Sequence, residues 1–301
     1  MTVRHESAEP CDVDPVELGE SCRWDAIRRE LLWVDVLRGD LFRATAAGTH
    51  LEVLERVHVD GHLTSVSPVE PPADGWVVTV TRSVVHLGVD GTCRELAAPE
   101  HHNAPRVRLN DGCCDRAGRL WVGSMAYDNT PGAGSLYRFS SREGLERVRE
   151  GVTISNGIGW SPDGTEMYYV DSGAATLEAL DFDEATGRIG DPRLVAALDG
   201  AEEGVPDGLC VDAEGAIWVA VWGGGEVRRY SPAGELIAVV GVAASQPSSC
   251  AIGGASGTTL YVTSAREGMS ASQLAGEPLA GAVFACPVDV PGLPVGRFRL
   301  A

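Results

Sequence analysis

One strand pattern recurs six times along the chain, and this repeat constrains the fold more than any other feature. Each copy places an aromatic residue among apolar ones: LLWVDV, GWVVTV, RLWVGS, MYYVDS, AIWVAV and TLYVTS. The aromatic residues are Trp33, Trp76, Trp121, Tyr168, Trp218 and Tyr261, at steps of 43, 45, 47, 50 and 43 residues. Polar turns precede these strands and further short strands follow them. Such repeats are typical of β-propellers, so we predict an all-β, six-bladed β-propeller with four antiparallel strands per blade.

The six units fill the chain, so we expect residues 1–301 to form a single propeller domain. Residues 1–14 precede the first complete unit, and we expect them to form a flexible N-terminal tail. A propeller usually closes its ring by building the last blade from both chain ends. Residues 12–18 and residues 295–300 are both candidates for the closing strand, and the sequence does not decide between them.

A polar residue begins the short strand that precedes the turn in every unit. These six ring positions are Glu20, Ser65, Asn110, Asn156, Asp207 and Ser249. Because innermost strands line the channel of a propeller, we expect the six side chains to converge at one mouth of the channel. Carboxylate and amide oxygens suit Ca²⁺, Mg²⁺ or Mn²⁺, whereas Zn²⁺ is less natural without Cys or His. We interpret Ser65 and Ser249 as channel packing.

Charge and composition exclude several classes of function. The formal net charge is −19, which argues against nucleic acid or an anionic membrane as a partner. All 24 cationic residues are arginine, so no lysine is present for a Schiff base or a P-loop. We find no secretory signal, no run of 18 apolar residues and no CxxC pair among the eight cysteines. We therefore expect a cytoplasmic protein with reduced thiols, a monomer or weak homo-oligomer.

Other catalytic motifs are missing from the sequence. No GxSxG, HExxH or GxGxxG occurs. All seven histidines lie at or before residue 102, so units three to six contain no histidine base. We expect His101 and His102 to be surface loop residues.

Four of the ring positions, Glu20, Asn110, Asn156 and Asp207, lie in segments that resemble the SMP-30/gluconolactonase family, the regucalcin-like sugar lactonases. The matching segments are LGESCRWD (18–25), RLNDGCCDRAGRLWVGSM (108–125), ISNGIGWSPDGTEMYYVDS (154–172), VPDGLCVDAEGAIWVA (205–220) and LYVTSAREGM (260–269). The resemblance implies a propeller that hydrolyses sugar-type lactones with one divalent cation, with Ca²⁺ favoured over Mn²⁺, Mg²⁺ or Zn²⁺.

The family's functional residues transfer to individual positions of this chain. Its metal ligands correspond to Glu20, Asn156 and Asp207, and its substrate-binding residues to Arg108 and Asn110. A third substrate position corresponds to Asp128 in MAYDNTPGAG, where some relatives carry glutamate.

The resemblance implies a mechanism in which the cation polarises the lactone carbonyl and a carboxylate takes the proton from the attacking water. By analogy with the family we assign that role to Asp207, with Glu20 as the other candidate. Two alternatives remain: a phosphotriesterase-like hydrolase that uses the same site, and a non-catalytic calcium-binding or protein-interaction propeller. The expected partner is a small-molecule lactone.

Overall fold

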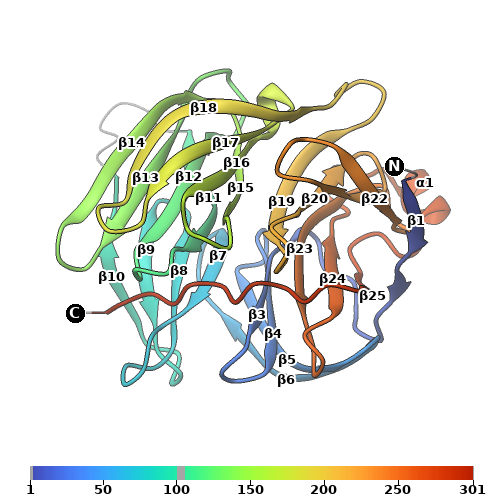
Figure 1. Cartoon of the computed structure of the whole chain (residues 1–301). Coiled ribbons are helices and arrows are strands. Elements are labelled where there is room, and N and C mark those ends of the chain that lie inside the picture. The colour runs from blue at the N-terminus through green and yellow to red at the C-terminus, as the bar shows by residue number, and fades with distance from the viewer. Residues whose placement is uncertain (1–2, 100–105, 301) are drawn as a thin grey trace.

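Six sheets surround a central channel in the computed structural model, which describes residues 3–99 and 106–300 (Figure 1). This arrangement confirms the six-bladed β-propeller. The innermost strands are β3 (Gly19–Asp25), β7 (Leu63–Pro68), β11 (Val107–Cys114), β15 (Ser155–Trp160), β19 (Val205–Val211) and β23 (Pro247–Gly253). The second strands are β4 (Glu30–Asp35), β8 (Trp76–Val80), β12 (Leu120–Ala126), β16 (Glu166–Asp171), β20 (Ile217–Trp222) and β24 (Thr259–Ser264). The third strands are β5 (Asp40–Ala47), β9 (Ser83–Leu87), β13 (Gly134–Ser140), β17 (Thr176–Asp183), β21 (Glu226–Tyr230) and β25 (Val283–Pro287).

The outer strands complete the blades. They are β6 (His50–His58), β10 (Cys93–Ala97), β14 (Gly144–Val152), β18 (Arg188–Ala197), β22 (Leu236–Gly241) and β2 (Glu9–Pro10). A short 3₁₀ turn, η1 (Ser172–Ala174), and one short helix, α1 (Ala271–Gly276), lie in the connections. No helix in the described part of the chain is long and apolar enough to cross a membrane. The eight cysteines are free thiols, as the sequence predicted.

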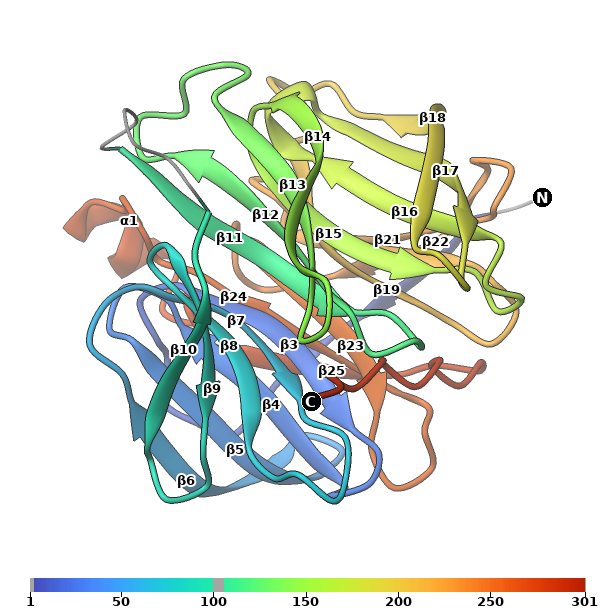
Figure 2. The ribbon, with the colours of Figure 1, turned by 90° about the vertical axis from the view of Figure 1, so that its left-hand side faces the viewer.

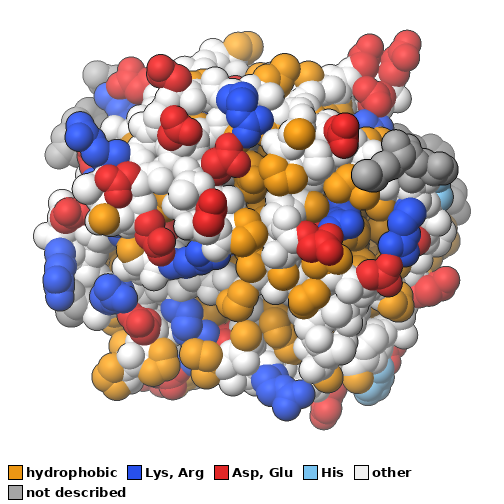
Figure 3. Space-filling model, viewed as in Figure 1, with side chains coloured by type: hydrophobic (Ala, Val, Ile, Leu, Met, Phe, Trp, Pro, Cys, Tyr) orange, Lys and Arg blue, Asp and Glu red, His pale blue; other side chains and the backbone are white. Residues whose placement is uncertain are grey.

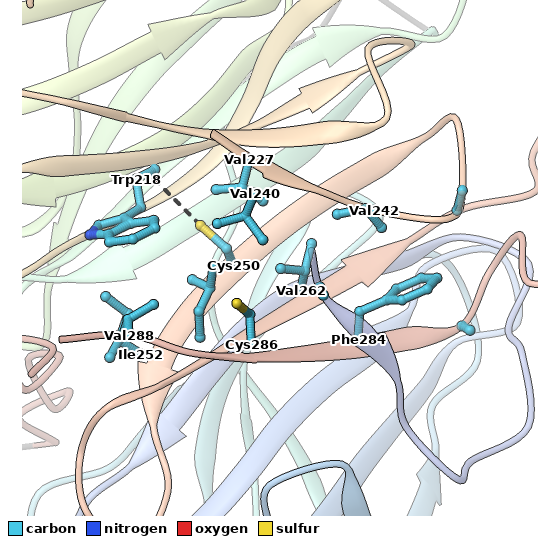
Figure 4. Packing of buried hydrophobic residues seen from close by; sticks show 14 residues of the cluster. Trp218, Val227, Val240, Val242, Cys250, Ile252, Val262, Phe284, Cys286 and Val288 are labelled. Carbon is cyan, nitrogen blue, oxygen red and sulfur yellow. Dashed lines mark hydrogen bonds between the residues drawn. The ribbon is translucent and has the colours of Figure 1, made fainter. Parts of the chain in front are cut away.

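The repeated aromatic residues stabilise the blades by packing between them. All six are at most 4% exposed. A hydrophobic cluster lies in each of the six interfaces between adjacent blades. Figure 4 shows the cluster between the fifth and sixth blades, where Trp218 lies beside Cys250 and Val240 lies toward Val262. Burial of this apolar surface is the main force that holds neighbouring blades together.

A β-bulge interrupts the pairing of every innermost strand at or beside its ring position. In the third, fourth and fifth blades the ladder skips Asn110, Asn156 and Asp207. Bulges bend a strand and redirect a side chain. Ser65 and Ser249 instead stay in register with their partner strands and are at most 1% exposed. The structure therefore supports the interpretation of both serines as channel packing.

Glycine follows two of the ring residues because the innermost strands approach each other closely. A Cβ atom on Gly157 would lie 2.6 Å from the carbonyl oxygen of Asp207, and one on Gly208 would lie 2.6 Å from Oγ of Ser249. Both distances are too short for any side chain. The Asn–Gly and Asp–Gly pairs thus mark strand packing around the channel rather than tight turns.

The N-terminal segment closes the ring, which corrects two expectations. Strand β2 pairs antiparallel with β25 and forms the outer strand of the last blade. It lies outside both candidate ranges, 12–18 and 295–300. Strand β1 (Arg4–Ser7) pairs parallel with β22 as a fifth strand of the fifth blade. The flexible tail expected for residues 1–14 is therefore wrong for residues 4–10, because backbone pairing orders them; residues 1 and 2 lie outside the described chain.

The chain ends in an extended segment, residues 290–300, that crosses one end of the channel and is called the C-terminal strap below (Figures 1 and 2). The amide of Leu293 donates to the carbonyl of Val211, and the amide of Phe298 donates to that of Pro68. Figure 2 shows the strap on the side of the molecule opposite α1. In Figure 3, which views the strap side, hydrophobic side chains lie near the centre among acidic and basic ones. The strap therefore closes the channel at the end remote from the ring positions.

Replacing Arg297 of the strap with alanine is expected to lower the free energy of unfolding by about 1.5–3 kcal/mol, the range for hydrogen bonds to charged groups. Its Nη1 lies 2.6 Å from the fully buried carboxylate of Asp25, so the variant loses a charged donor inside the protein. Denaturant titration measures the change. The matched control is Arg299→Ala, because Arg299 pairs with Glu70 at the surface and such pairs contribute at most about 1 kcal/mol. Equal losses for the two variants would contradict the prediction.

Candidate metal and substrate site

Four of the six ring positions meet in one cavity at the end of the channel opposite the strap. Glu20, Asn110, Asn156 and Asp207 line this cavity together with Arg108, which precedes Asn110 by two residues. Its volume is about 390 Å³, within the range of small-molecule sites. The structure thus brings together five of the six residues that the sequence singled out for metal and substrate.

A chain of hydrogen bonds orients the amide side chains across three blades. Arg108 Nη1 donates to Oδ1 of Asn110, whose Nδ2 donates to Oδ1 of Asn156 at 2.8 Å. Nδ2 of Asn156 donates to Oγ of Ser172 at 2.8 Å, and this hydroxyl donates to the carbonyl of Pro206 at 2.6 Å. Because both of its amide hydrogen-bonding groups are engaged in this way, Asn156 is held with its Oδ1 on the Asn110 side and its Nδ2 on the Ser172 side.

The carboxylates of Glu20 and Asp207 repel each other in a part of the cavity that water reaches poorly. Burial, followed by the charge of Asp111, raises the pKa of Glu20 to about 8. Burial and then Glu20 raise the pKa of Asp207 well above its ordinary value. Arg108 opposes both shifts, but burial lowers its own pKa. A second cation in the cavity would therefore stabilise the ionised forms of both acids.

The donor set of this cavity fits a hard divalent cation. Glu20 and Asp207 supply carboxylate oxygens and Asn156 supplies a carbonyl oxygen, which are the ligands that Ca²⁺ and Mg²⁺ prefer. Oδ1 of Asp207 is buried and has no hydrogen-bond partner among residues 3–99 and 106–300. Within those residues no group of three His, Cys, Asp or Glu side chains is arranged to hold a metal, and the Asn156 oxygen is the third donor of this set.

An ion pair crosses the channel beside the two carboxylates. Nη2 of Arg23, on β3, lies 3.1 Å from Oδ1 of Asp111, on β11, and both side chains are 3% exposed. The guanidinium also donates to the carbonyls of Cys22 and Gly112. Beyond this pair, a small space of about 60 Å³ extends to strap residues 293–296. Arg23 and Asp111 thus connect the first and third blades and separate the cavity from the far half of the channel.

Asp128 is not part of the cavity, in contrast to the sequence expectation. Its carboxylate accepts hydrogen bonds from the amide and the hydroxyl of Thr130, at 3.3 and 2.7 Å, and is 48% exposed. This local turn holds the short acidic side chain at the surface, next to Arg106. The following residue, Asn129, lines the cavity instead and has a φ of 54°, a conformation that asparagine tolerates well.

Sequence reasoning missed His62 and Tyr127 at the mouth of the cavity. The Tyr127 hydroxyl and Nδ1 of His62 share a hydrogen bond of 2.9 Å, and the Arg108 guanidinium lies 5.9 Å from the centre of the Tyr127 ring. Burial and then Arg108 lower the pKa of His62. His62 directly precedes β7 and Tyr127 directly follows β12, so strand direction alone places both at this end of the blades. The position of these two residues at the strand ends is therefore a signal from which the sequence could have predicted them. His101 and His102, expected to be surface loop residues, lie outside the described residues.

The metal-free protein is expected to lose stability as the pH rises from about 5 to about 8. The pKa of Glu20 is about 8 in the folded protein against an ordinary 4.5, so the folded state binds this proton more tightly. That contribution is complete below the ordinary pKa and is lost as the pH rises through the folded one. A divalent cation binds the ionised acids and should raise the melting temperature more at pH 8 than at pH 5.

Calorimetry at both pH values, with chelator and with Ca²⁺, measures this effect. Other groups also titrate over this range, so Glu20→Gln serves as the comparison and should show a flatter dependence on pH. An equal rise in melting temperature with Ca²⁺ at pH 5 and pH 8 would contradict the assignment of the two acids.

Comparisons with known proteins agree with the geometry. A family described as "SMP-30/Gluconolactonase/LRE-like region" matches residues 18–266. Regucalcin of Sus scrofa is 34% identical over 283 residues, which cover 92% of this chain and 93% of that protein. A crystal structure of a calcium-binding protein, regucalcin, from Agrobacterium tumefaciens superposes with a TM-score of 0.89 at 28% identity, with full coverage of both chains. A luciferin-regenerating enzyme also has a TM-score of 0.89 at 28% identity, with 97% and 99% coverage.

Proposed function

Because the chain belongs to the SMP-30/gluconolactonase/LRE-like family, we propose that it is a divalent-metal-dependent hydrolase that opens the ester bond of sugar-type lactones. One observation supports this proposal above the others. The buried carboxylate of Asp207, which has an unpaired oxygen, and the half-buried carboxylate of Glu20 lie in the same cavity as Arg108, a half-buried arginine that has no carboxylate partner among the described residues. Two carboxylates and an arginine without a carboxylate partner in one cavity would only destabilise a channel that served structure alone, so their presence favours a bound ligand.

The proposed cation is held by Glu20, Asn156 and Asp207, and its physiological identity is proposed to be Ca²⁺. When bound, it supplies a Lewis acid for the carbonyl oxygen of the ester. Asp207 takes the proton from the attacking water, because its carboxylate is buried and lacks a competing donor at Oδ1. Arg108 orients the substrate through its remaining guanidinium hydrogens, and Asn110 fixes Arg108 in place. The bond between the carbonyl carbon and the ring oxygen breaks, and the ring oxygen leaves as a hydroxyl group with the proton that Asp207 took, so lactone and water become a hydroxy acid.

A panel of lactones assayed against a series of metals after chelation tests the proposal. We expect hydrolysis of glucono-δ-lactone to be lost on chelation and restored by Ca²⁺, Mn²⁺, Mg²⁺ or Zn²⁺ to different extents. A phosphotriester belongs in the same panel, because that chemistry also uses a cation on an oxygen-rich site. No hydrolysis of any lactone with any metal would overturn the enzymatic proposal.

The second candidate is a calcium-binding propeller without catalysis, which the description of the Agrobacterium structure favours. The same experiment separates the two functions. Calorimetric binding of Ca²⁺ without any ester hydrolysis would favour the non-catalytic protein. The open cavity around Arg108 favours the enzyme, because a cation alone needs no space of about 390 Å³.

A further inference from the structure

The cavity changes chemistry between its floor and its mouth. In a strand, residues two apart face the same side, so the residues two places before the ring positions form a second ring nearer the mouth. This second ring consists of Leu18, Leu63, Arg108, Ile154, Val205 and Pro247. Leu18, Arg108, Ile154 and Val205 line the cavity, and Arg108 is the only polar member of the ring. The polar floor is therefore followed outward by an apolar wall contributed by the first, fourth and fifth blades, while His62, Asn129 and Glu267 line other parts of the cavity.

Two side chains from strand ends continue this apolar wall. Leu37, in the turn between β4 and β5, and Trp222, at the end of β20, both line the cavity. Leu37 is 37% exposed although it is aliphatic, and Tyr127 beside the same mouth is 45% exposed. Exposed apolar side chains that continue into a binding cavity indicate that part of the ligand is apolar.

The apolar wall does not suit hydroxyl groups. A sugar lactone carries hydroxyl groups around its ring, and those that face Leu18, Ile154 and Val205 would lose water without gaining a hydrogen bond. An alkyl group in the same place would release water both from its own surface and from the apolar side chains of the wall. The wall lies directly outside the two carboxylates, so a lactone whose carbonyl reaches the floor would extend a ring substituent along it.

We propose that Leu18, Leu37, Ile154, Val205 and Trp222 form an apolar subsite, and that the protein opens δ-lactones carrying an alkyl chain on the ring carbon next to the ring oxygen. This inference rests on the proposed lactonase function and adds a substrate class to it. The floor recognises the ester, which is common to all lactones. The apolar subsite recognises the alkyl substituent.

A homologous series tests the subsite with the metal-loaded protein. The substrates are δ-valerolactone, δ-hexalactone and δ-octalactone, which carry no chain, a methyl group and a propyl group. Burial of each methylene is expected to raise kcat/KM about three- to four-fold, so the octalactone should exceed the valerolactone by on the order of 30-fold. The δ-lactams with the same substituents resist hydrolysis because amides are less reactive than esters, so calorimetry with them measures binding alone. Their affinities should rise with chain length as kcat/KM of the lactones does.

Two matched variants assign the effect to the cavity mouth. Leu37→Ser should lower the ratio of kcat/KM for octalactone to that for valerolactone about five-fold. Ile27→Ser is the control, because Ile27 is a 62% exposed aliphatic residue of the same blade, in the turn between β3 and β4 at its other end. This control should keep the wild-type ratio.

The outcomes separate this inference from the proposed function. Hydrolysis of gluconolactone with no dependence on chain length would overturn the apolar subsite and leave the lactonase intact. If no lactone is hydrolysed, the lactonase proposal fails and the lactams decide the subsite: affinity that does not increase with chain length overturns it. A ratio lowered equally by Leu37→Ser and Ile27→Ser would also overturn it.

Discussion

Asp207→Asn is expected to lower kcat/KM for the best lactone by roughly a thousand-fold while it raises the melting temperature of the metal-free protein. The proposed role in proton transfer accounts for about 10²–10⁴ in rate. The gain in stability has a separate cause. Asp207 is 4% exposed, its Oδ1 has no partner within the described residues, and burial and Glu20 raise its pKa. A neutral amide of the same shape removes the repulsion, so opposite changes in activity and stability are the signature of a functional buried acid.

Steady-state kinetics with a saturating metal and calorimetry with chelator measure the two effects. Ser65→Ala is the matched control, because Ser65 occupies the equivalent position of the second blade. Its hydroxyl hydrogen-bonds Thr79 at 2.7 Å and lies outside the cavity lining. We expect this control to lose about 1 kcal/mol of stability and to keep its activity within three-fold. Undiminished turnover in folded Asp207→Asn would remove Asp207 from the mechanism.

The largest loss of stability is expected for Arg23→Met, at about 3–5 kcal/mol, which is the usual cost of leaving a buried charge without its partner. Arg23 and Asp111 are 2% and 3% exposed, and their charged atoms lie 3.1 Å apart. Burial alone raises the pKa of Asp111, and Arg23 opposes that shift. Without Arg23 the protein must either bury an unpaired carboxylate or keep it protonated.

A double-mutant cycle separates the charge from the packing. The variant that combines Arg23→Met with Asp111→Leu has no buried charge here, so we expect it to recover most of the stability that Arg23→Met loses. Urea titration of the four proteins gives the coupling free energy. If the double variant were as unstable as the sum of the two single variants, the ion pair would have no special role in the channel.

The propeller and most of its site were predictable because both follow from periodicity. The spacing of Trp33, Trp76 and the later aromatic residues reports the repeat of the blade. Equivalent positions of equivalent blades must lie on one ring. Alignment of the six units therefore predicts that Glu20 and Asp207 lie close together, although nearly two hundred residues separate them in the chain. Local sequence also marked the glycines after Asn156 and Asp207, although only the structure shows that they serve close strand packing.

Features without a repeat were not predictable in this way. Asp128 occupies the expected place in the chain, but its hydrogen bonds to Thr130 turn it to the surface. The closing strand β2 depends on pairing with β25, far along the chain, and its two residues carry no strand signal of their own. The hydrogen bond between His62 and Tyr127 joins two blades and has no counterpart in the repeat.

The sequence by itself determined the number of blades, the order of the strands and the identity of the polar ring, because each depends on a pattern with a period of two residues or of one blade. Only the tertiary structure decided which ring members reach the cavity. The bulges in β11, β15 and β19 take Asn110, Asn156 and Asp207 out of the ladder, whereas Ser65 and Ser249 stay paired and buried. Glu20 also stays paired, with Val34, yet its side chain lines the cavity. A bulge arises from how two strands fit together around a crowded channel, and one strand's sequence does not contain that fit.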